Sequence, residues 1–195
     1  MSSPIPPPEQ NFVHLHNHTE YSMLDGAARI DDMFRTAAEL GMPAIATTDH
    51  GYIFGAYEFW STGRKYGVKP IIGLEAYLTP GTHRTDKSRV KFADGGRDDV
   101  SGGGAYTHMT LLARNNNGMH NLFRLASLAS LEGYYFKPRM DRELLSQYGQ
   151  GLIATTGCPS GEIQTRLRLG QYDKAREAAA EFRDIFGEGN FYCEL

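Results

Sequence analysis

Short apolar runs recur along the chain, and polar turns and longer helical stretches separate them. Each run has four or five residues and is bounded by Gly, Pro, Asn or Asp, a pattern typical of buried strands. We predict strands at residues 12–15, 44–47, 70–74, 109–113, 151–155 and 191–195.

Between these runs, apolar residues recur every three or four positions and predict helices at 30–38, 56–66, 122–129 and 172–186. Gly41 with Pro43 ends the first of them, and Gly187 ends the last. The last helix has the clearest apolar stripe, which consists of Tyr172, Ala175, Ala179, Phe182 and Phe186. Because strands alternate with helices, we expect an α/β fold around a parallel sheet, either open or closed into a barrel.

Two segments fall outside this alternation. Residues 1–10 are rich in Pro and lack the order of a signal peptide, so we expect a flexible tail before one domain at 11–195. Residues 81–104 combine Gly with many charges and predict a surface insertion. Neighbouring Asp residues favour a plain solvated loop as strongly as a phosphate-binding one. The cations that could contact phosphates are Arg84, Lys87, Arg89, Lys91 and Arg97.

The charge balance argues against a general nucleic-acid-binding protein. Lys and Arg number 20 and Asp and Glu number 23, giving a net charge of −3, whereas binding to phosphates depends on an excess of cations. The apolar runs are far shorter than the roughly 18 residues of a membrane span, so we expect no membrane contact. Two cysteines do not make a disulfide framework, so we expect a reducing, cytoplasmic location, where the Asn17 sequon is not glycosylated.

Metal-capable side chains follow four of the predicted strands. His16 and His18 follow the first strand, His50 the second, Glu75 the third and Cys158 the fifth. In parallel α/β folds the carboxyl ends of the strands meet at one edge, so we expect these side chains to converge. Four strands that each deliver a ligand to one edge favour a metal site over coincidence.

The first strand offers up to three imidazoles. His16 and His18 point to the same side of an extended strand, so both can reach one ion. His14 shares this alternation, but it lies one step back inside the strand, where a buried, hydrogen-bonded structural role is an equal alternative. Asp25 follows on a Met-Leu-Asp-Gly turn and strengthens the case for a metal.

The next three candidates differ in what their position implies. We favour His50 as a ligand over its neighbour Asp49, which can instead cap a helix or support a ligating imidazole. Glu75 adjoins a strongly apolar strand, where a carboxylate is costly to bury without a partner such as a metal. His108 opens its strand instead of ending it, so its position leaves the choice between ligand and structural residue open.

The two cysteines have different interpretations. Cys158 lies in a Gly-Cys-Pro-Ser-Gly turn that favours a ligand over apolar filler, whereas Cys193 lies inside an apolar run and is interpreted as filler. Mixed imidazole, carboxylate and thiolate ligands suit zinc-like or manganese-like ions, and their number indicates more than one ion. Such ions can generate hydroxide and clamp a phosphoester, so the residues favour hydrolysis of phosphate esters. The sequence contains no Cys-x-x-Cys pair, P-loop, dinucleotide glycine fingerprint or serine nucleophile elbow.

Five stretches of sequence form motifs that are highly specific when taken together. They are 12–26 (FVHLHNHTEYSMLDG), 41–44 (GMPA), 47–51 (TTDHG), 69–77 (KPIIGLEAY) and 155–161 (TTGCPSG). They resemble the PHP (polymerase and histidinol phosphatase) domain with which bacterial replicative polymerases of the DNA polymerase III alpha family begin. The resemblance covers nearly the whole chain past the tail. The insertion at 81–104 is similar to the form found in actinobacterial and related polymerases.

This resemblance implies a distorted (β/α)₇ TIM-like barrel that holds two or three divalent ions, Zn²⁺ first, with Mn²⁺ or Mg²⁺ as alternatives. It leaves His14 and Asp49 as supporting candidates. Members with the full ligand set are 3′–5′ exonucleases that proofread DNA at the primer 3′ end, and members with eroded sets keep the domain for stability or docking. On the family's pattern the ligands in this chain are His16, His18, Asp25, His50, Glu75, His108 and Cys158.

The family closes its ligand set with an Asp-x-His pair on a later strand, and this chain ends at Leu195 without it. We therefore expect the N-terminal part of a larger DNA-directed DNA polymerase, with the barrel incomplete at its C-terminus. This part alone is expected to retain metal weakly and to show little or no exonuclease activity. The resemblance implies that the sliding clamp and other replisome subunits bind outside this chain.

Two alternatives to the proofreading domain stay open. One is a free-standing phosphatase of histidinol-phosphatase type, which uses the same metal chemistry on a small phosphate monoester. The other is a non-catalytic scaffold domain that bound metals only stabilise. Substitution of His16 and His18 separates the scaffold from the proofreader, because only a proofreader loses replication fidelity along with stability.

Overall fold

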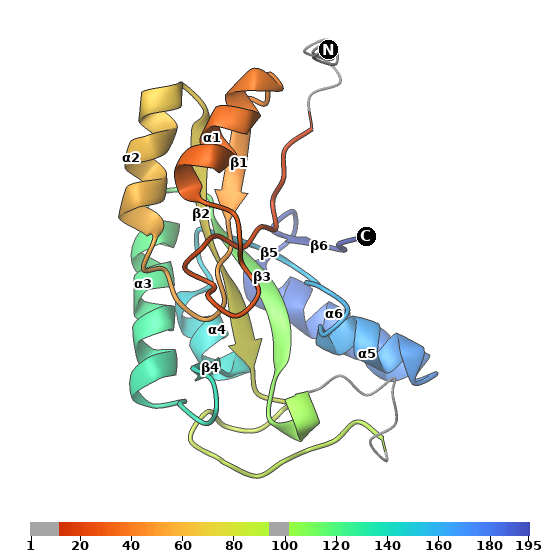
Figure 1. Ribbon diagram of the computed structural model, residues 1–195. Coiled ribbons are helices and arrows are strands. Elements are labelled where there is room, and N and C mark those ends of the chain that lie inside the picture. Colours follow the sequence, from red (N-terminus) through yellow and green to blue (C-terminus); the bar gives the residue numbers. More distant parts are fainter. Residues whose placement is uncertain (1–11, 94–101) are drawn as a thin grey trace. The chain divides into compact units, whose positions relative to one another are not determined.

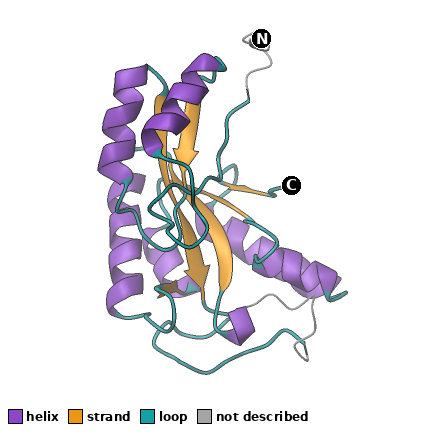
Figure 2. Ribbon diagram, viewed as in Figure 1, coloured by secondary structure: helices purple, strands orange, loops and turns teal. Residues whose placement is uncertain are grey.

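The computed structural model describes residues 12–93 and 102–195, which form a mixed α/β fold of helices and strands (Figures 1 and 2). The chain divides into two compact units, Met1–Leu74 and Glu75–Leu195, and the boundary falls within strand β2. The tail predicted at 1–10 lies outside the described residues, as does the part of the predicted insertion at 94–101. Among the helices that are described, not one is both long and apolar enough to span a membrane.

The first unit contains two helices and two strands. It consists of α1 (Ile30–Glu39), β1 (Ala44–Thr47), α2 (Ala56–Tyr66) and the first part of β2 (Lys69–Leu78). β1 and β2 pair in parallel, with Ala44 opposite Lys69 and Thr47 opposite Ile72. The strand predicted at 44–47 and the helix predicted at 56–66 are confirmed at both ends.

The two helices of this unit pack side by side because each has one apolar side (Figure 1). Ile30, Phe34 and Ala37 of α1 share one core cluster with Phe59 of α2. The ring centroids of Phe34 and Phe59 are 4.5 Å apart. Gly63 allows this approach, since a Cβ there would lie 3.0 Å from the Phe34 ring. Full burial of each such large side chain contributes about 1.5–3 kcal/mol.

The strand predicted at 12–15 does not form, although the chain there is held against β1. The backbone nitrogen of Ala46 donates to the His14 carbonyl at 2.9 Å, and that of Thr48 donates to the Asn17 carbonyl at 2.8 Å. The Asn17 amide side chain donates to the carbonyls of His14 and Ala46. The Asn17 side chain thus makes hydrogen bonds that backbone groups would make in a regular β-ladder. The pairing of this segment with β1 is therefore irregular.

The second unit holds most of the strands. It contains the rest of β2, β3 (Thr107–Ala113), β4 (Arg139–Met140), β5 (Leu152–Thr155) and β6 (Phe191–Tyr192). The strand order is β2-β3-β5-β6, and β4 also pairs with β2. β2 and β4 are parallel, as are β5 and β6, whereas β3 and β5 are antiparallel, with Thr110 opposite Thr155.

The expectation of a uniformly parallel sheet is therefore wrong at β3. Parallel neighbours need a crossover connection, and a helix usually supplies it. The connection from β2 to β3 runs through the predicted insertion, and its described part contains only a short 3₁₀ turn at Gly102–Gly104. The alternation of strands and helices on which the prediction rested is interrupted at this connection.

The second unit contains four described helices: α3 (Asn116–Leu131), α4 (Arg142–Tyr148), α5 (Glu162–Arg168) and α6 (Tyr172–Phe186). α3 contacts β3, β4 and β5, and α6 contacts β5 and β6 (Figure 1). The stripe predicted for α6 needs two corrections. Ala178 is buried in place of Ala179, and Tyr172 is exposed.

A fully buried cation fastens the described part of the predicted insertion to this unit. The Arg139 guanidinium donates to the carbonyls of Arg84 and Asp86, each at 2.9 Å. It also donates to the carbonyls of Gly133 at 3.1 Å and Ala105 at 3.3 Å. Burial lowers the pKa of Arg139 below its usual value, because desolvation disfavours the charged form.

A second arginine is engaged with acids and not available to phosphates. The Arg84 guanidinium lies 2.6 Å from Glu132, 3.1 Å from Asp141 and 3.2 Å from Glu143. For Arg84 these ion pairs favour the structural alternative over contact with phosphates, because its donors already bind carboxylates. The corresponding prediction for Arg97 falls outside the described residues.

Candidate metal centre

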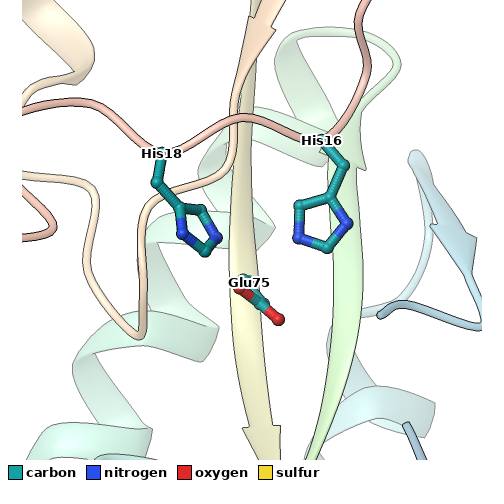
Figure 3. Close-up of side chains that lie close together, drawn as sticks. All are labelled: His16, His18 and Glu75. Carbon is teal, nitrogen blue, oxygen red and sulfur yellow. The ribbon is translucent and has the colours of Figure 1, made fainter. Parts of the chain in front are cut away.

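Four of the sequence-predicted ligands lie in the first unit. His16 and His18 follow the segment held along β1, and Figure 3 shows both imidazole rings on the same side of that segment, with their centroids 5.5 Å apart. Asp25 Oδ2 lies 2.8 Å from His50 Nε2 and 3.4 Å from His18 Nδ1. The His18, Asp25 and His50 ligand atoms all lie within 4.8 Å of one another, close enough to share one divalent ion.

Asp25 is positioned by a tight turn. The backbone nitrogens of Asp25 and Gly26 both donate to the Ser22 carbonyl, at 3.0 and 2.7 Å. A Cβ at Gly26 would lie 1.9 Å from the Thr19 carbonyl oxygen, so the turn closes only with glycine there. Partial burial acts to raise the pKa of Asp25, but the hydrogen bond and charge of His50 outweigh it and hold that pKa below its usual value. Asp25 is therefore ionised at neutral pH, as a metal ligand must be.

Asp49 fixes this turn against β1. Its Oδ1 accepts from the Thr19 backbone nitrogen and the Ser22 hydroxyl, both at 2.7 Å. Its Oδ2 accepts from the Thr19 hydroxyl at 2.8 Å and the Thr47 hydroxyl at 3.0 Å. Asp49 is buried, and these bonds give it a supporting role that differs from the predicted helix cap or imidazole partner. It supports the turn that carries Asp25.

The sequence left His14 as either a metal ligand or a buried structural residue, and the structure does not bury it. Its side chain is exposed, and its ring lies edge-on to Phe12 with the centroids 4.9 Å apart. Only its backbone carbonyl takes part in holding the segment, by accepting from Ala46 and Asn17. The buried, hydrogen-bonded alternative for His14 is therefore wrong, whereas its place as a supporting candidate stays a prediction.

The other three predicted ligands meet in the second unit. Glu75 is the seventh residue of β2, where Figure 3 labels it, and its side chain is buried. Its Oε1 lies 2.7 Å from His108 Nδ1. The Cys158 thiol donates to the same Glu75 oxygen at 3.3 Å and lies 3.5 Å from His108 Nδ1. A carboxylate, an imidazole and a thiol thus converge within hydrogen-bonding distance.

His108 reaches this group because β3 runs antiparallel to β5. The pairing of Thr110 with Thr155 places the opening of β3 beside the closing end of β5. The His108 backbone nitrogen donates to the Ser160 carbonyl at 3.1 Å, in the turn that carries Cys158. In a parallel sheet, the start of a strand would lie at the opposite edge. The reversed direction of one strand therefore explains the residue whose role the sequence left open.

Cys158 is half-buried, and the Ser160 backbone nitrogen donates to its sulfur at 3.4 Å. Burial, together with the charge of Glu75, raises the pKa of the Cys158 thiol to about 11. The thiol is therefore protonated at neutral pH until a metal displaces the proton, so metal binding should release protons and strengthen as pH rises. Cys193 is exposed, so its interpretation as apolar filler is wrong.

This raised pKa predicts the pH dependence of thiol reactivity. In the metal-free Cys193→Ser variant, we expect iodoacetamide to alkylate Cys158 slowly at pH 8 and increasingly fast toward pH 11, because only the thiolate reacts. The folded state holds this proton more tightly than the unfolded state does. Stability from the neutral thiol is therefore present below the ordinary value of 9.0 and is lost as pH rises toward about 11. Mass spectrometry of the alkylated product measures the rate, and a half-maximal rate below pH 9 contradicts the prediction.

Several supporting residues were not found from the sequence. Thr19, Ser22 and Thr47 supply three hydroxyl donors to Asp49, and the hydroxyl-rich context of Thr47-Thr48-Asp49 was the available signal. One further group of possible ligands was also missed, namely His83, Asp141 and Glu143. Arg84 already places a cation between the two carboxylates of that group, so its acids are neutralised without a metal.

The PHP domain family matches residues 14–195, and the chain belongs to this family. The curated relatives include DNA polymerase III subunit alpha of Saccharopolyspora erythraea, 58% identical over 96% of this chain, and that of Mycobacterium leprae, 57% identical over 96%. The chain spans 16% of the length of each of these relatives. A solved amidohydrolase from Chromobacterium violaceum is 20% identical over 60% of this chain and 33% of its own, with a TM-score of 0.40, too slight a likeness to support an argument.

Proposed function

We propose that this chain provides the metal-binding phosphodiesterase domain of a replicative DNA polymerase III alpha subunit and trims DNA from the primer 3′ end. The observation that carries the proposal is the grouping of the predicted ligands. His18, Asp25 and His50 offer ligand atoms within 4.8 Å of one another in the first unit. In the second unit Glu75, His108 and Cys158 meet within 3.5 Å. The names of the close relatives support the polymerase assignment.

The proposed ligands hold two or three divalent ions. Their donor chemistry fits such ions, because two imidazoles and an ionised carboxylate make one group and an imidazole, a carboxylate and a thiol make the other. A thiol among the donors favours Zn²⁺ over Mg²⁺, with Mn²⁺ between them. The proposed ligand set is His16, His18, Asp25, His50, Glu75, His108 and Cys158. A barrel of (β/α)₇ type is the architecture that we propose around them.

The residues of the chain have separable tasks in this proposal. Divalent ions, when bound by these residues, would supply Lewis-acid chemistry toward the phosphodiester and would make water a better nucleophile near neutral pH. Asp49 and Gly26 keep the turn closed, so that Asp25 remains beside His18 and His50. Preorganisation of this kind matters because misplacement of a catalytic group by about 1 Å can cost about 100-fold in rate.

Substitution of one ligand tests the proposal. In the protein purified at its natural length, we expect His50→Ala to lower the release of 3′-terminal nucleotides from a mismatched primer–template by about 100-fold or more. Metal content, measured by mass spectrometry, should fall in parallel. The matched control is His120→Ala, which removes an exposed histidine of α3 outside both ligand groups and should change neither measurement.

The alternatives predict different outcomes. If His50→Ala lowers only the melting temperature while trimming of the mismatched primer continues, the domain is a scaffold and the proposal is wrong. If the wild-type protein hydrolyses small phosphate monoesters but not DNA ends, the phosphatase alternative replaces it. The names of the close relatives give the phosphatase alternative less support than the proofreading one.

A further inference from the structure

Large apolar side chains are exposed immediately beside the ligands of the first unit. Met23 and Leu24 directly precede the ligand Asp25, and their side chains are 88% and 93% exposed. Phe54 lies on the loop that follows His50 and Tyr57 lies in the first turn of α2, and their side chains are 72% and 78% exposed. We call these four residues, Met23, Leu24, Phe54 and Tyr57, the apolar rim. Exposed apolar residues are ordinary when they occur singly, but a group beside a functional site indicates a binding surface.

The rim is held in place by defined contacts. The rings of Tyr52 and Phe54 stack nearly parallel, with centroids 4.7 Å apart and an interplanar angle of 13°. A Cβ at Gly55 would lie 2.7 Å from the Tyr21 ring, so Tyr21 packs directly on this loop. The Tyr21 hydroxyl also donates to Glu58 at 2.8 Å. The loop of Met23 and Leu24 is therefore fastened to the loop and the start of α2 that carry Phe54 and Tyr57, and the stacked Phe54 ring is held in place.

The same face continues along α2. Tyr57, Trp60 and Arg64 are spaced three and four residues apart and are exposed, whereas Phe59 and Gly63 of this helix are buried. The Tyr57 and Trp60 ring centroids are 5.9 Å apart. The Arg64 guanidinium lies 5.0 Å over the Trp60 ring. Trp60 is the only tryptophan of the chain, so its fluorescence reports on this face.

The charge of the first unit indicates that the apolar rim can bind the bases of a nucleic-acid strand better than its phosphates. Between residues 12 and 74 acidic side chains outnumber basic ones by seven to five. Two of those cations are already paired, Arg35 with Asp32 and Lys65 with Asp31. Binding of a nucleic-acid strand through its phosphates needs unpaired cations, whereas stacking of bases on aromatic rings does not.

We propose that the apolar rim stacks the unpaired bases at the end of a DNA strand and so delivers the terminal phosphodiester to His18, Asp25 and His50. This inference rests on the proposed function, since it names how that site takes its substrate. Stacking is tolerant of sequence, as every base has a flat face, and the alanine substitution of one stacking ring weakens binding by about tenfold or more. Unpaired ends are favoured over duplex ends, whose bases are stacked on each other.

Trp60 fluorescence measures this binding directly. Phosphorothioate-linked hexathymidylate, which resists hydrolysis, is titrated into the 195-residue chain and compared with an abasic hexamer of the same charge. We expect hexathymidylate to quench Trp60 and to bind about tenfold or more tightly than the abasic strand. Phe54→Ala should remove most of that difference, and Phe54→Tyr should restore it. Tyr172→Ala, at another exposed aromatic, is the matched control and should have no effect.

The outcomes separate this inference from the proposed function. Equal binding of the thymidylate and abasic strands would falsify base stacking on the rim. Metal binding and hydrolysis of bis(p-nitrophenyl) phosphate by the same protein test the proposed function independently, because that substrate carries no base. If Phe54→Ala leaves strand binding unchanged but abolishes self-association in size-exclusion chromatography, the rim is a protein interface and the inference is wrong. In the trimming assay the variant should raise KM for unpaired ends while kcat stays nearly unchanged.

Discussion

Replacing Asp49 by Ala is expected to lower the free energy of unfolding by about 4 kcal/mol. The carboxylate is buried and accepts four hydrogen bonds, from the Thr19 backbone and from the Thr19, Ser22 and Thr47 hydroxyls. Its removal leaves buried donors without an acceptor, which costs about 1–3 kcal/mol for each group that stays unsatisfied. Urea unfolding monitored by circular dichroism measures the change.

The same substitution should weaken metal binding by about 10- to 100-fold, although Asp49 is not a proposed ligand. The reason is that Asp49 holds the turn on which Asp25 lies. Asp49→Asn keeps the shape but replaces one acceptor by a donor, so we expect an intermediate loss. Asp32→Ala, at an exposed carboxylate of α1, is the control and should change stability by less than about 0.5 kcal/mol. A loss below about 1 kcal/mol for Asp49→Ala would show that the turn does not depend on this carboxylate.

Replacing Glu75 by Leu is expected to have opposite effects with and without metal. In the metal-free protein Glu75 is a buried carboxylate beside His108 and Cys158. Glu75 is fully buried and costly to desolvate, and Leu occupies a similar volume without that cost, while the partly exposed His108 ring can hydrogen-bond to water instead, so the metal-free variant should melt at the same or a higher temperature. With metal, the wild type gains about 2.7 kcal/mol when the ion is present at 100 times its Kd, and the variant should lose most of this gain.

Thermal melting with Zn²⁺ or with a chelator measures both effects on the same samples. Glu188→Leu removes an exposed acid outside the ligand groups, so this control should keep the full metal-dependent shift. If the Glu75→Leu protein retains that shift, Glu75 is not a ligand. If it is destabilised by several kcal/mol without metal, the carboxylate is needed for packing. Either result shows whether Glu75 binds the metal or stabilises the fold.

Elements with a clear local pattern of apolar residues and flanking Gly or Pro could be predicted from the sequence, and elements without one could not. The helix at Ala56–Tyr66 and the strand at Ala44–Thr47 match their predictions because apolar spacing and flanking Gly or Pro define them locally. α4 and α5 have seven residues each and β4 has two, too few for a period to show. At 12–15 the apolar pattern is present, but the side chain of Asn17 takes over the hydrogen bonding.

In the candidate site, too, the features with a local sequence signal could be predicted, and those that depend on long-range pairing could not. The spacing of His16 and His18 follows from local geometry, and both rings do lie on one side of their segment. The position of His108 depends on the direction in which β3 pairs with β5, and that direction is a long-range property without a local signal. The hydrogen bonds of Asp49 likewise join residues about 30 positions apart.

Hydrogen bonds hold the chain near both ends of the predicted insertion. They therefore affect the free-energy cost of changing the length of the insertion. The Val90 backbone nitrogen donates to the Gly104 carbonyl at 2.8 Å, and the Arg139 guanidinium donates to the carbonyls of Arg84 and Asp86. Once both ends of a loop are fastened, each doubling of its length costs only about 0.6 kcal/mol. Evolution can therefore lengthen or shorten this stretch at little expense, and an affinity tag spliced in after Ala93 should leave the ligand groups undisturbed.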